Sequence, residues 1–257
     1  PQWPWHAMVA AGGGSFRSPG LFDGIVRWVS VQPLASHPVV ISITVSEEGV
    51  LEKWRARSTY AAVGAILLLG CLLVLLVRGD YQVAYVYSVT NNSLPVYLKI
   101  TALWGGQSGS LLFWSWLMAL FAGAVTLRKW ERDREFLPWV IVVCLVTLAF
   151  FTGLTLFLPG GNPFERYWQT TSGQVLGQFM FPPAGAVAFQ PENGQGLNPL
   201  LRHPGMVIHP PMLYLGFVAF VIPFAFAIAA LVTGRSDDRW IRVTRRWALA
   251  AWLFLSL

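Results

Sequence analysis

The chain has little charge for its length. Only 12% of its 257 residues are Asp, Glu, Lys or Arg, whereas soluble domains typically carry about 25%. Its hydrophobic fraction of 55% excludes intrinsic disorder, which requires low hydrophobicity. The scarcity of charge argues against an ordinary cytosolic enzyme and indicates a protein surrounded by a membrane.

Cysteine is also scarce. Cys71 and Cys144 both lie in apolar runs and no CxxC pair is present, so the spacing supports neither thiol chemistry nor a zinc site. Nothing resembles a catalytic triad, a phosphate-binding loop or a paired-carboxylate site. The net charge of +6 does not indicate nucleic acid, because basic residues of membrane proteins gather in cytoplasmic loops.

Long uncharged apolar runs dominate the sequence. Four runs contain no Asp, Glu, Lys or Arg: Thr59–Val77, Ile100–Leu127, Phe136–Leu158 and Met206–Gly234. Each approaches or exceeds the roughly 20 residues that cross a bilayer, and a fifth run begins at Trp247. We predict an all-α polytopic transmembrane helix bundle with at least four complete spans and a truncated fifth. The bundle occupies residues 58–257, after an N-terminal segment, residues 1–57, of unassigned role.

The placement of Lys and Arg predicts the orientation. Basic residues gather in three segments: before the first span, between the second and third spans, and after the fourth span. They are Lys53, Arg55, Arg57, Arg128, Lys129, Arg132, Arg134, Arg235, Arg239, Arg242, Arg245 and Arg246. The other two connections, 78–99 and 159–205, carry four basic residues between them. Since cytoplasmic loops are rich in Lys and Arg, we expect a multi-pass membrane protein with the long loop 159–205 facing the periplasm or another exterior space. A β-branched run at Val39–Val45 predicts a strand.

The second span opens with the motif WGGQSGSLLFW, from Trp104 to Trp114. Gly105 and Gly109 are four residues apart, as are Gly106 and Ser110, so each pair shares one helical face. Small residues at this spacing let a neighbouring backbone approach closely. They would equally let a flat macrocycle lie between the two tryptophans. Both interpretations remain open from spacing alone.

The fourth span opens with PGMVIHPPMLYLG, which contains His209. A histidine inside an apolar span is rare and is by default a functional-site hypothesis. Gly205 and Gly216 lie near its helical face and would leave room beside the imidazole, while Pro210 and Pro211 start or kink the helix and fix its direction. An imidazole nitrogen is a common haem-iron ligand. The alternative is a structural histidine that bonds a neighbouring helix.

The remaining histidines carry less. His203 lies in the predicted exterior loop beside Arg202 and is interpreted as a surface residue. His6 and His37 fall in the unassigned N-terminal segment.

These motifs together resemble the CcmF-type cytochrome c haem lyases. The similarity covers residues 58–257: YVYSVTNNSLP at Tyr85–Pro95, the Trp104–Trp114 motif, NPFER at Asn162–Arg166, and Leu197–Ala230 with its LNPLL and HPP sequences. The HPP motif with the upstream LNPLL segment is the most specific part. The family's WGxxWxWD segment does not occur in this chain and is expected downstream of it.

The resemblance implies a role in cytochrome c maturation. Such proteins bind haem and deliver or ligate it to apocytochrome c at the outer face of the bacterial inner membrane. The expected partners are a haem chaperone, apocytochrome c, other maturation subunits and quinol. The family also holds a haem b, for which His209 would supply one axial iron ligand and a residue outside this chain the second. The candidate cofactor-binding residues are His209, Trp104, Gly105, Gly106, Gly109, Trp114, Gly205, Pro210, Pro211, Tyr214 and Gly216.

Other functions remain as alternatives. The chain could be an accessory or scaffold subunit of a larger membrane electron-transfer complex without lyase activity. A quinol-oxidising subunit would require two axial ligands within the chain, and a transporter usually shows internal repeats; the sequence shows neither.

Overall fold

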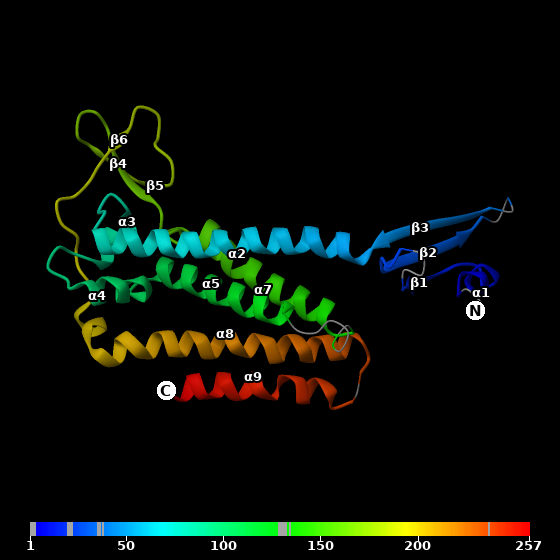
Figure 1. The fold of residues 1–257 in the computed structure, drawn as a ribbon. Helices are drawn as coiled ribbons and strands as arrows, with labels where there is room; N and C mark the ends of the chain where they lie inside the picture. Colours follow the sequence, from blue (N-terminus) through cyan, green and yellow to red (C-terminus); the bar gives the residue numbers. More distant parts are fainter. Residues whose placement is uncertain are drawn as a thin grey trace. The chain divides into compact units, whose positions relative to one another are not determined.

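The computed structural model describes residues 4–19, 23–34, 37, 39–127, 133, 135–235 and 237–257 (Figure 1); for 4, 47–48, 50–59 and 61–62 it describes the backbone alone. The chain divides into two compact units, Pro1–Ala61 and Ala62–Leu257. All seven basic residues expected in the first two cytoplasmic segments lie outside the described side chains, namely Lys53, Arg55, Arg57, Arg128, Lys129, Arg132 and Arg134.

The first unit contains a small antiparallel sheet. Helix α1 (Pro4–Ala10) precedes strands β1 (Gly14–Ser18), β2 (Arg27–Pro33) and β3 (Val40–Ser46), which lie in the order β1-β2-β3. Strand β3 confirms the strand predicted at Val39–Val45, where β-branched residues favour extended backbone. The expectation of an all-α protein is wrong here, and again in the long loop described below.

Within the second unit, the described residues include three helices long and apolar enough to cross a membrane: α5 (Gln107–Thr126), α7 (Leu137–Phe157) and α8 (Pro204–Val232). Helices α7 and α8 agree with the predicted third and fourth spans to within two residues at each end. The first predicted run lies in α2 (Glu47–Arg78). The apolar part of α2 with described side chains is Val63–Arg78, which is shorter than the three spans. Four complete spans are therefore not established.

The second span begins later than predicted. Instead of one helix from Ile100, the chain forms α4 (Val96–Thr101), a 3-10 turn η1 (Ala102–Trp104) and then α5. Gly106 is extended, with φ −151° and ψ 172°, and forms the N-terminal boundary of α5. The Gly-Gly pair thus interrupts a run that hydropathy alone reads as continuous.

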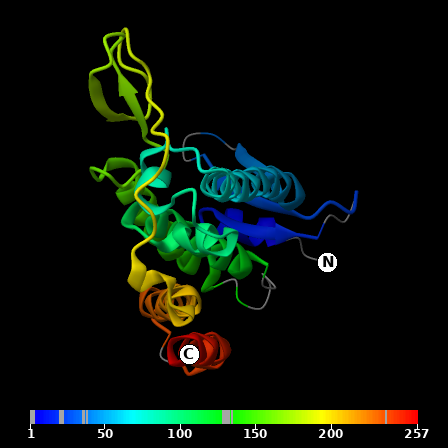
Figure 2. The same cartoon turned by 90° about the vertical axis from the view of Figure 1, so that its left-hand side faces the viewer.

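Helices α8 and α9 (Arg239–Ser256) run antiparallel side by side, and α5 and α7 lie on the other side of α8 (Figures 1 and 2). Large side chains such as Met118, Phe136 and Phe226 fill the core between these helices. Ala225 and Ala229, both fully buried, are small enough to let neighbouring helices approach closely.

Two connections meet at one end of this bundle. Helix α3 (Ala84–Val89) and α4 form the first, and the predicted exterior loop 159–205 forms the second. The loop contains a sheet of order β5-β4-β6, with β4 (Arg166–Gln169), β5 (Val175–Phe179) and β6 (Val187–Ala188), followed by a 3-10 turn η2 (Pro199–Arg202).

Backbone hydrogen bonds join the two connections. Gln195 N–H donates to the Tyr87 carbonyl at 2.8 Å, and Gly196 N–H donates to the Thr90 carbonyl at 3.0 Å. At the other end of the bundle, Arg235 and Glu135 form an ion pair at 2.6 Å between the α8–α9 and α5–α7 connections. Alternate connections therefore lie at opposite ends, as the predicted topology requires.

Candidate functional site

The segment that leads into α8 is held by local hydrogen bonds. The Asn198 side chain accepts from Leu200 N–H at 3.0 Å and caps η2. The Arg202 guanidinium donates twice to the Leu197 carbonyl, at 3.0 and 2.8 Å. His203 is the N-cap of α8, where its Nδ1 accepts from Gly205 N–H at 3.1 Å. The exposed His203 is thus a surface residue, as predicted, with a capping function that the sequence reading missed.

The two prolines free backbone carbonyls inside α8. A helical N–H normally donates to the carbonyl four residues earlier, and proline has no N–H. Pro210 therefore leaves the Met206 carbonyl without its helical donor. The Trp104 indole N–H donates to this carbonyl at 3.4 Å. The Trp-Gly motif and the HPP motif, which are about a hundred residues apart in sequence, are joined at this point.

A second connection between the motifs runs through Tyr214. Its hydroxyl donates to the Ser110 hydroxyl at 3.3 Å, and Ser110 donates to the Trp104 carbonyl at 3.4 Å. The Tyr214 ring lies edge-on to Phe113 and Trp114, with ring centroids 6.0 and 5.3 Å apart. These contacts hold the start of α5 against α8.

Trp114 lies where α5, α7 and α8 meet. Its ring contacts Tyr214 and also Phe151 and Phe217, at centroid distances of 5.1 and 6.3 Å. Its buried indole N–H has no hydrogen-bond partner among the described residues. Trp104 stacks on Phe113 at 5.9 Å, so the ring contacts from Trp104 to Trp114 run through Phe113 and Tyr214. Aromatic side chains, rather than an open slot, thus connect the two tryptophans.

The space beside the Trp-Gly motif is filled by protein. A Cβ on Gly105 would lie 2.7 Å from Leu197 Cδ1, and one on Gly106 would lie 3.0 Å from the Tyr85 ring. A Cβ on Gly109 would collide with the Leu103 carbonyl and the Tyr85 hydroxyl. The expectation that these glycines leave room for a macrocycle differs from the structure, which favours the close-packing alternative.

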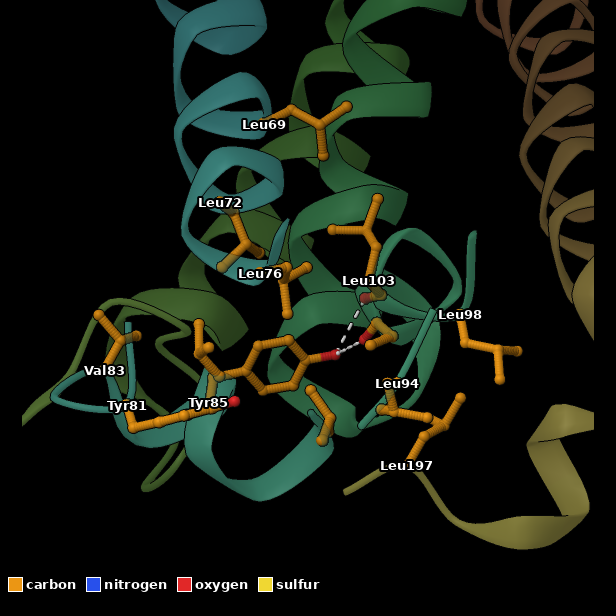
Figure 3. Close-up of a cluster of buried hydrophobic side chains, with 13 residues drawn as sticks. Leu69, Leu72, Leu76, Tyr81, Val83, Tyr85, Leu94, Leu98, Leu103 and Leu197 are labelled. Carbon is orange, nitrogen blue, oxygen red and sulfur yellow. Dashed lines mark hydrogen bonds between the residues drawn. The ribbon is translucent and has the colours of Figure 1, made fainter. Parts of the chain in front are cut away.

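Tyr85 is the side chain that occupies this space. Its hydroxyl lies 2.7 Å from the Ala102 carbonyl and 3.0 Å from the Leu103 carbonyl, as Figure 3 shows. Burial among the leucines of the same cluster raises the pKa of the Tyr85 hydroxyl. The sequence reading quoted Tyr85 only as part of a family motif and assigned it no role.

His209 lies in the second turn of α8, and its side chain is exposed. No hydrogen bond or ion pair to it is found among the residues that the structure describes. Pro210 and Pro211 beside it are half-buried. Its imidazole is therefore available to a ligand, and the alternative of a histidine bonded to a neighbouring helix finds no partner in the described part of the chain.

Helix α9 covers the same face of α8 farther along. Gly216 is seven residues after His209 and thus on nearly the same face; a Cβ there would collide with Leu255 of α9. Gly216 therefore serves helix packing. Helix α9 ends before it reaches the first turns of α8 (Figure 1), so His209 lies beyond the covered stretch. Gly205, one turn before His209, is exposed, and its nearest neighbour is His203.

The structure thus brings Trp104, Trp114 and Tyr214 to one boundary between α5 and α8. His209 is exposed on the same stretch of α8, between Met206 and Tyr214. No group of three His, Cys, Asp or Glu side chains suited to a metal ion is found in the described part of the chain. The Met206 carbonyl and the Ser110 hydroxyl were missed by sequence reasoning. A proline four residues after Met206 was the available signal for the first, and Ser110 had none.

Comparison with known proteins identifies the family. Residues 104–257 match the family model described as cytochrome C assembly protein. Two relatives named cytochrome c-type biogenesis protein CcmF are similar. The one from Escherichia coli (strain K12) is 39% identical over 73% of this chain and 26% of its own length. The one from Pseudomonas aeruginosa is 38% identical over 80% and 29%.

A solved structure named cytochrome c heme lyase CcmF is also similar, with a TM-score of 0.55 and 25% identity over 78% of this chain and 28% of that one. The chain spans just over a quarter of the length of these relatives. The matched residues include both the Trp-Gly and the HPP motif. The chain therefore belongs to the cytochrome c assembly protein family and is a CcmF-type member of it.

Proposed function

We propose that this chain forms a haem-binding part of a haem lyase that matures cytochrome c at the outer face of the bacterial inner membrane. The proposal rests on family membership and on one observation. His209 is an exposed imidazole with no hydrogen-bond partner in the described part of the chain, at the end of the bundle where the two long connections meet. Its proposed role is to bind haem iron. Haem held there would either supply one-electron chemistry as a resident cofactor or be in transit to apocytochrome c.

The fit of haem to these residues can be judged from the structure. The glycines of the Trp-Gly motif are covered by Tyr85 and Leu197, so a macrocycle does not fit against them. The face of α8 that carries His209 is open because α9 covers it only from about Gly216 onward. We therefore propose that a haem ring lies on this open face and that a second axial ligand comes from outside this chain.

The residues around His209 position it. Two prolines remove backbone donors from this turn of α8, and the Trp104 indole compensates at the Met206 carbonyl. His203 caps the helix six residues earlier. The imidazole thus projects from a turn fixed at its start and at its side. The proposed partners are a haem chaperone, apocytochrome c and other maturation subunits, which would reach this end of the bundle from the exterior, and quinol, which would reach it from the bilayer.

The test uses the full-length protein that contains this chain. His209→Ala should abolish or strongly reduce the reduced haem absorption of the purified protein, at an unchanged level in the membrane. His203→Asn is the matched control, since it removes a nearby histidine but keeps a side-chain acceptor at the N-cap. Unchanged haem content in His209→Ala would reject the ligand role.

The same preparation distinguishes a resident haem b from haem in transit. Purified from cells that lack a haem chaperone, a protein with resident haem keeps its His209-dependent absorption. Haem in transit disappears under that condition.

The accessory or scaffold alternative is supported by the packed glycines of the Trp-Gly motif, because they act between protein segments. It predicts copurification with a membrane electron-transfer complex and no chemically detectable haem. The exposed His209, which forms no hydrogen bond or ion pair with another helix among the described residues, favours the haem-binding proposal.

A further inference from the structure

We propose that the segment Phe179–Phe181 of the long loop is a membrane-interface anchor, which holds the β5-β4-β6 sheet against the outer surface of the bilayer. The inference concerns the loop alone and does not rest on haem binding. The segment exposes three large apolar side chains in a row: Phe179, Met180 and Phe181 are 45%, 47% and 77% exposed. Contiguous exposed apolar surface of this kind marks a site of interaction.

The segment is held next to the end of a membrane helix. Helix α7 ends at Phe157, and a tight turn follows in which Gly161 N–H donates to the Leu158 carbonyl at 2.8 Å. The next residue, Asn162, contacts Met180, with 3.7 Å between its amide nitrogen and the sulfur. Met180 thus lies in space next to Asn162, which is only a few residues after the end of α7.

The apolar surface of the helix extends to this point. Leu156 and Phe157 in the last turn of α7 are 61% and 84% exposed, and in a membrane span such side chains face lipid. The contact of Met180 with Asn162 places Phe179–Phe181 next to this apolar surface, which their exposed side chains would extend. This continuity favours the bilayer over a protein partner as the occupant of the segment.

The position of the sheet agrees with this. In Figures 1 and 2 the β5-β4-β6 sheet projects to the side of the bundle rather than along its axis. A sheet placed in this way at the end of a membrane bundle lies over the surrounding lipid. Trp168 in β4 donates its indole N–H to the Phe179 carbonyl at 3.0 Å, and tryptophan is enriched at membrane interfaces.

The composition of the loop indicates how it binds. Residues 167–191 contain no Asp, Glu, Lys, Arg or His, so the segment carries no charge that would attract anionic headgroups or be costly to desolvate. Its binding must come from apolar area, as in interfacial segments with aromatic side chains. The probe for the test is therefore a vesicle of neutral phosphatidylcholine.

The experiment uses the full-length protein with Cys71→Ala and Cys144→Ala, reconstituted in these vesicles. An environment-sensitive fluorophore is attached to Phe181→Cys and, as the matched control, to Glu192→Cys, an exposed position on the part of the loop held against Asn92. At 181 we expect blue-shifted emission, quenching by doxyl-labelled lipid and loss of quenching by aqueous iodide. At 192 we expect iodide quenching only.

Two results would overturn the proposal. Iodide quenching at 181 as strong as at 192 would place the segment in water. Protection at 181 from both iodide and doxyl lipid would show that protein, rather than the bilayer, covers it. Because the fluorescence requires no haem, failure of this proposal and failure of the haem proposal are separate outcomes.

Discussion

The indole of Trp104 donates to the carbonyl of Met206, which Pro210 deprives of its helical donor. This hydrogen bond links the tryptophan just before α5 to the turn of α8 that contains the proline. In a bilayer an unsatisfied carbonyl is costly. Pro210, next to His209 in α8, is therefore tolerated because Trp104, in the 3-10 turn before α5, supplies a donor.

Removing this donor should destabilise the bundle modestly. Trp104→Phe keeps the aromatic stack on Phe113 but loses the hydrogen bond, which should cost about 0.5–1.5 kcal/mol. The measurement is thermal unfolding of the detergent-solubilised full-length protein. Trp252→Phe, at a position 63% exposed on α9, is the control and should leave the transition unchanged. An equal shift in both variants would contradict the role of the indole N–H.

Two glycines of α5 should respond in opposite directions to the same substitution. Gly109→Ala drives a methyl group into the Leu103 carbonyl and the Tyr85 hydroxyl, and overpacking of this kind costs about 1–3 kcal/mol or more. Gly123→Ala meets nothing within 4 Å and should stabilise the helix by up to about 1 kcal/mol. Thermal unfolding of the two variants side by side tests this. Tolerance of Gly109→Ala would show that the motif is not closely packed.

Tyr85 should make stability depend on alkaline pH. Burial raises its pKa above the value of about 10 that it has in the unfolded chain. The neutral hydroxyl therefore stabilises the fold fully below about pH 10, and this contribution is lost as the pH rises toward the folded-state pKa. Tyr85→Phe should be less stable at neutral pH by about 1–3 kcal/mol, because the buried Leu103 carbonyl loses the hydroxyl donor. The Ala102 carbonyl also loses this donor but keeps the Gly105 N–H.

The comparison isolates Tyr85 from the other tyrosines. Burial also raises the pKa of Tyr81 and Tyr167, so both proteins lose some stability at high pH. The difference between wild type and Tyr85→Phe should narrow above about pH 10. A difference that stays constant to pH 12 would show that ionisation of Tyr85 does not matter.

The cap at Asn198 should fix the approach to α8. Asn198→Ala removes the acceptor of Leu200 N–H and should cost about 1 kcal/mol, whereas Asn198→Asp keeps an acceptor and should cost less. Hydrogen exchange of the Leu200 amide is the direct measurement, and it should speed up in the alanine variant only. Equal exchange in both variants would mean that the cap does not protect this amide.

Hydropathy predicted the membrane helices well where a run had no internal signal for a break. The third and fourth spans match α7 and α8 because their length and lack of charge suffice. The second span was predicted too long, since the Gly105–Gly106 break depends on backbone geometry that apolarity does not report. The sheet in the long loop was missed because its strands are short and lack regular alternation.

The candidate site was only partly predictable. A histidine in an apolar run and a following proline pair are local signals, and His209 could be singled out from them. The packing of Tyr85 against the Trp-Gly motif depends on a contact between α3 and α5 that no spacing encodes. Small residues four apart indicate only that something approaches closely, so the sequence could not distinguish a tyrosine from a macrocycle.

The hydrogen bonds from Gln195 and Gly196 to Tyr87 and Thr90 restrict how α8 can move. They attach the segment that precedes α8 to the residues at the end of α3. A piston-like slide of α8 along its axis would have to break them first. Any rearrangement around His209 would therefore come from rotation of side chains or from a neighbouring element, while α8 keeps its position along its axis.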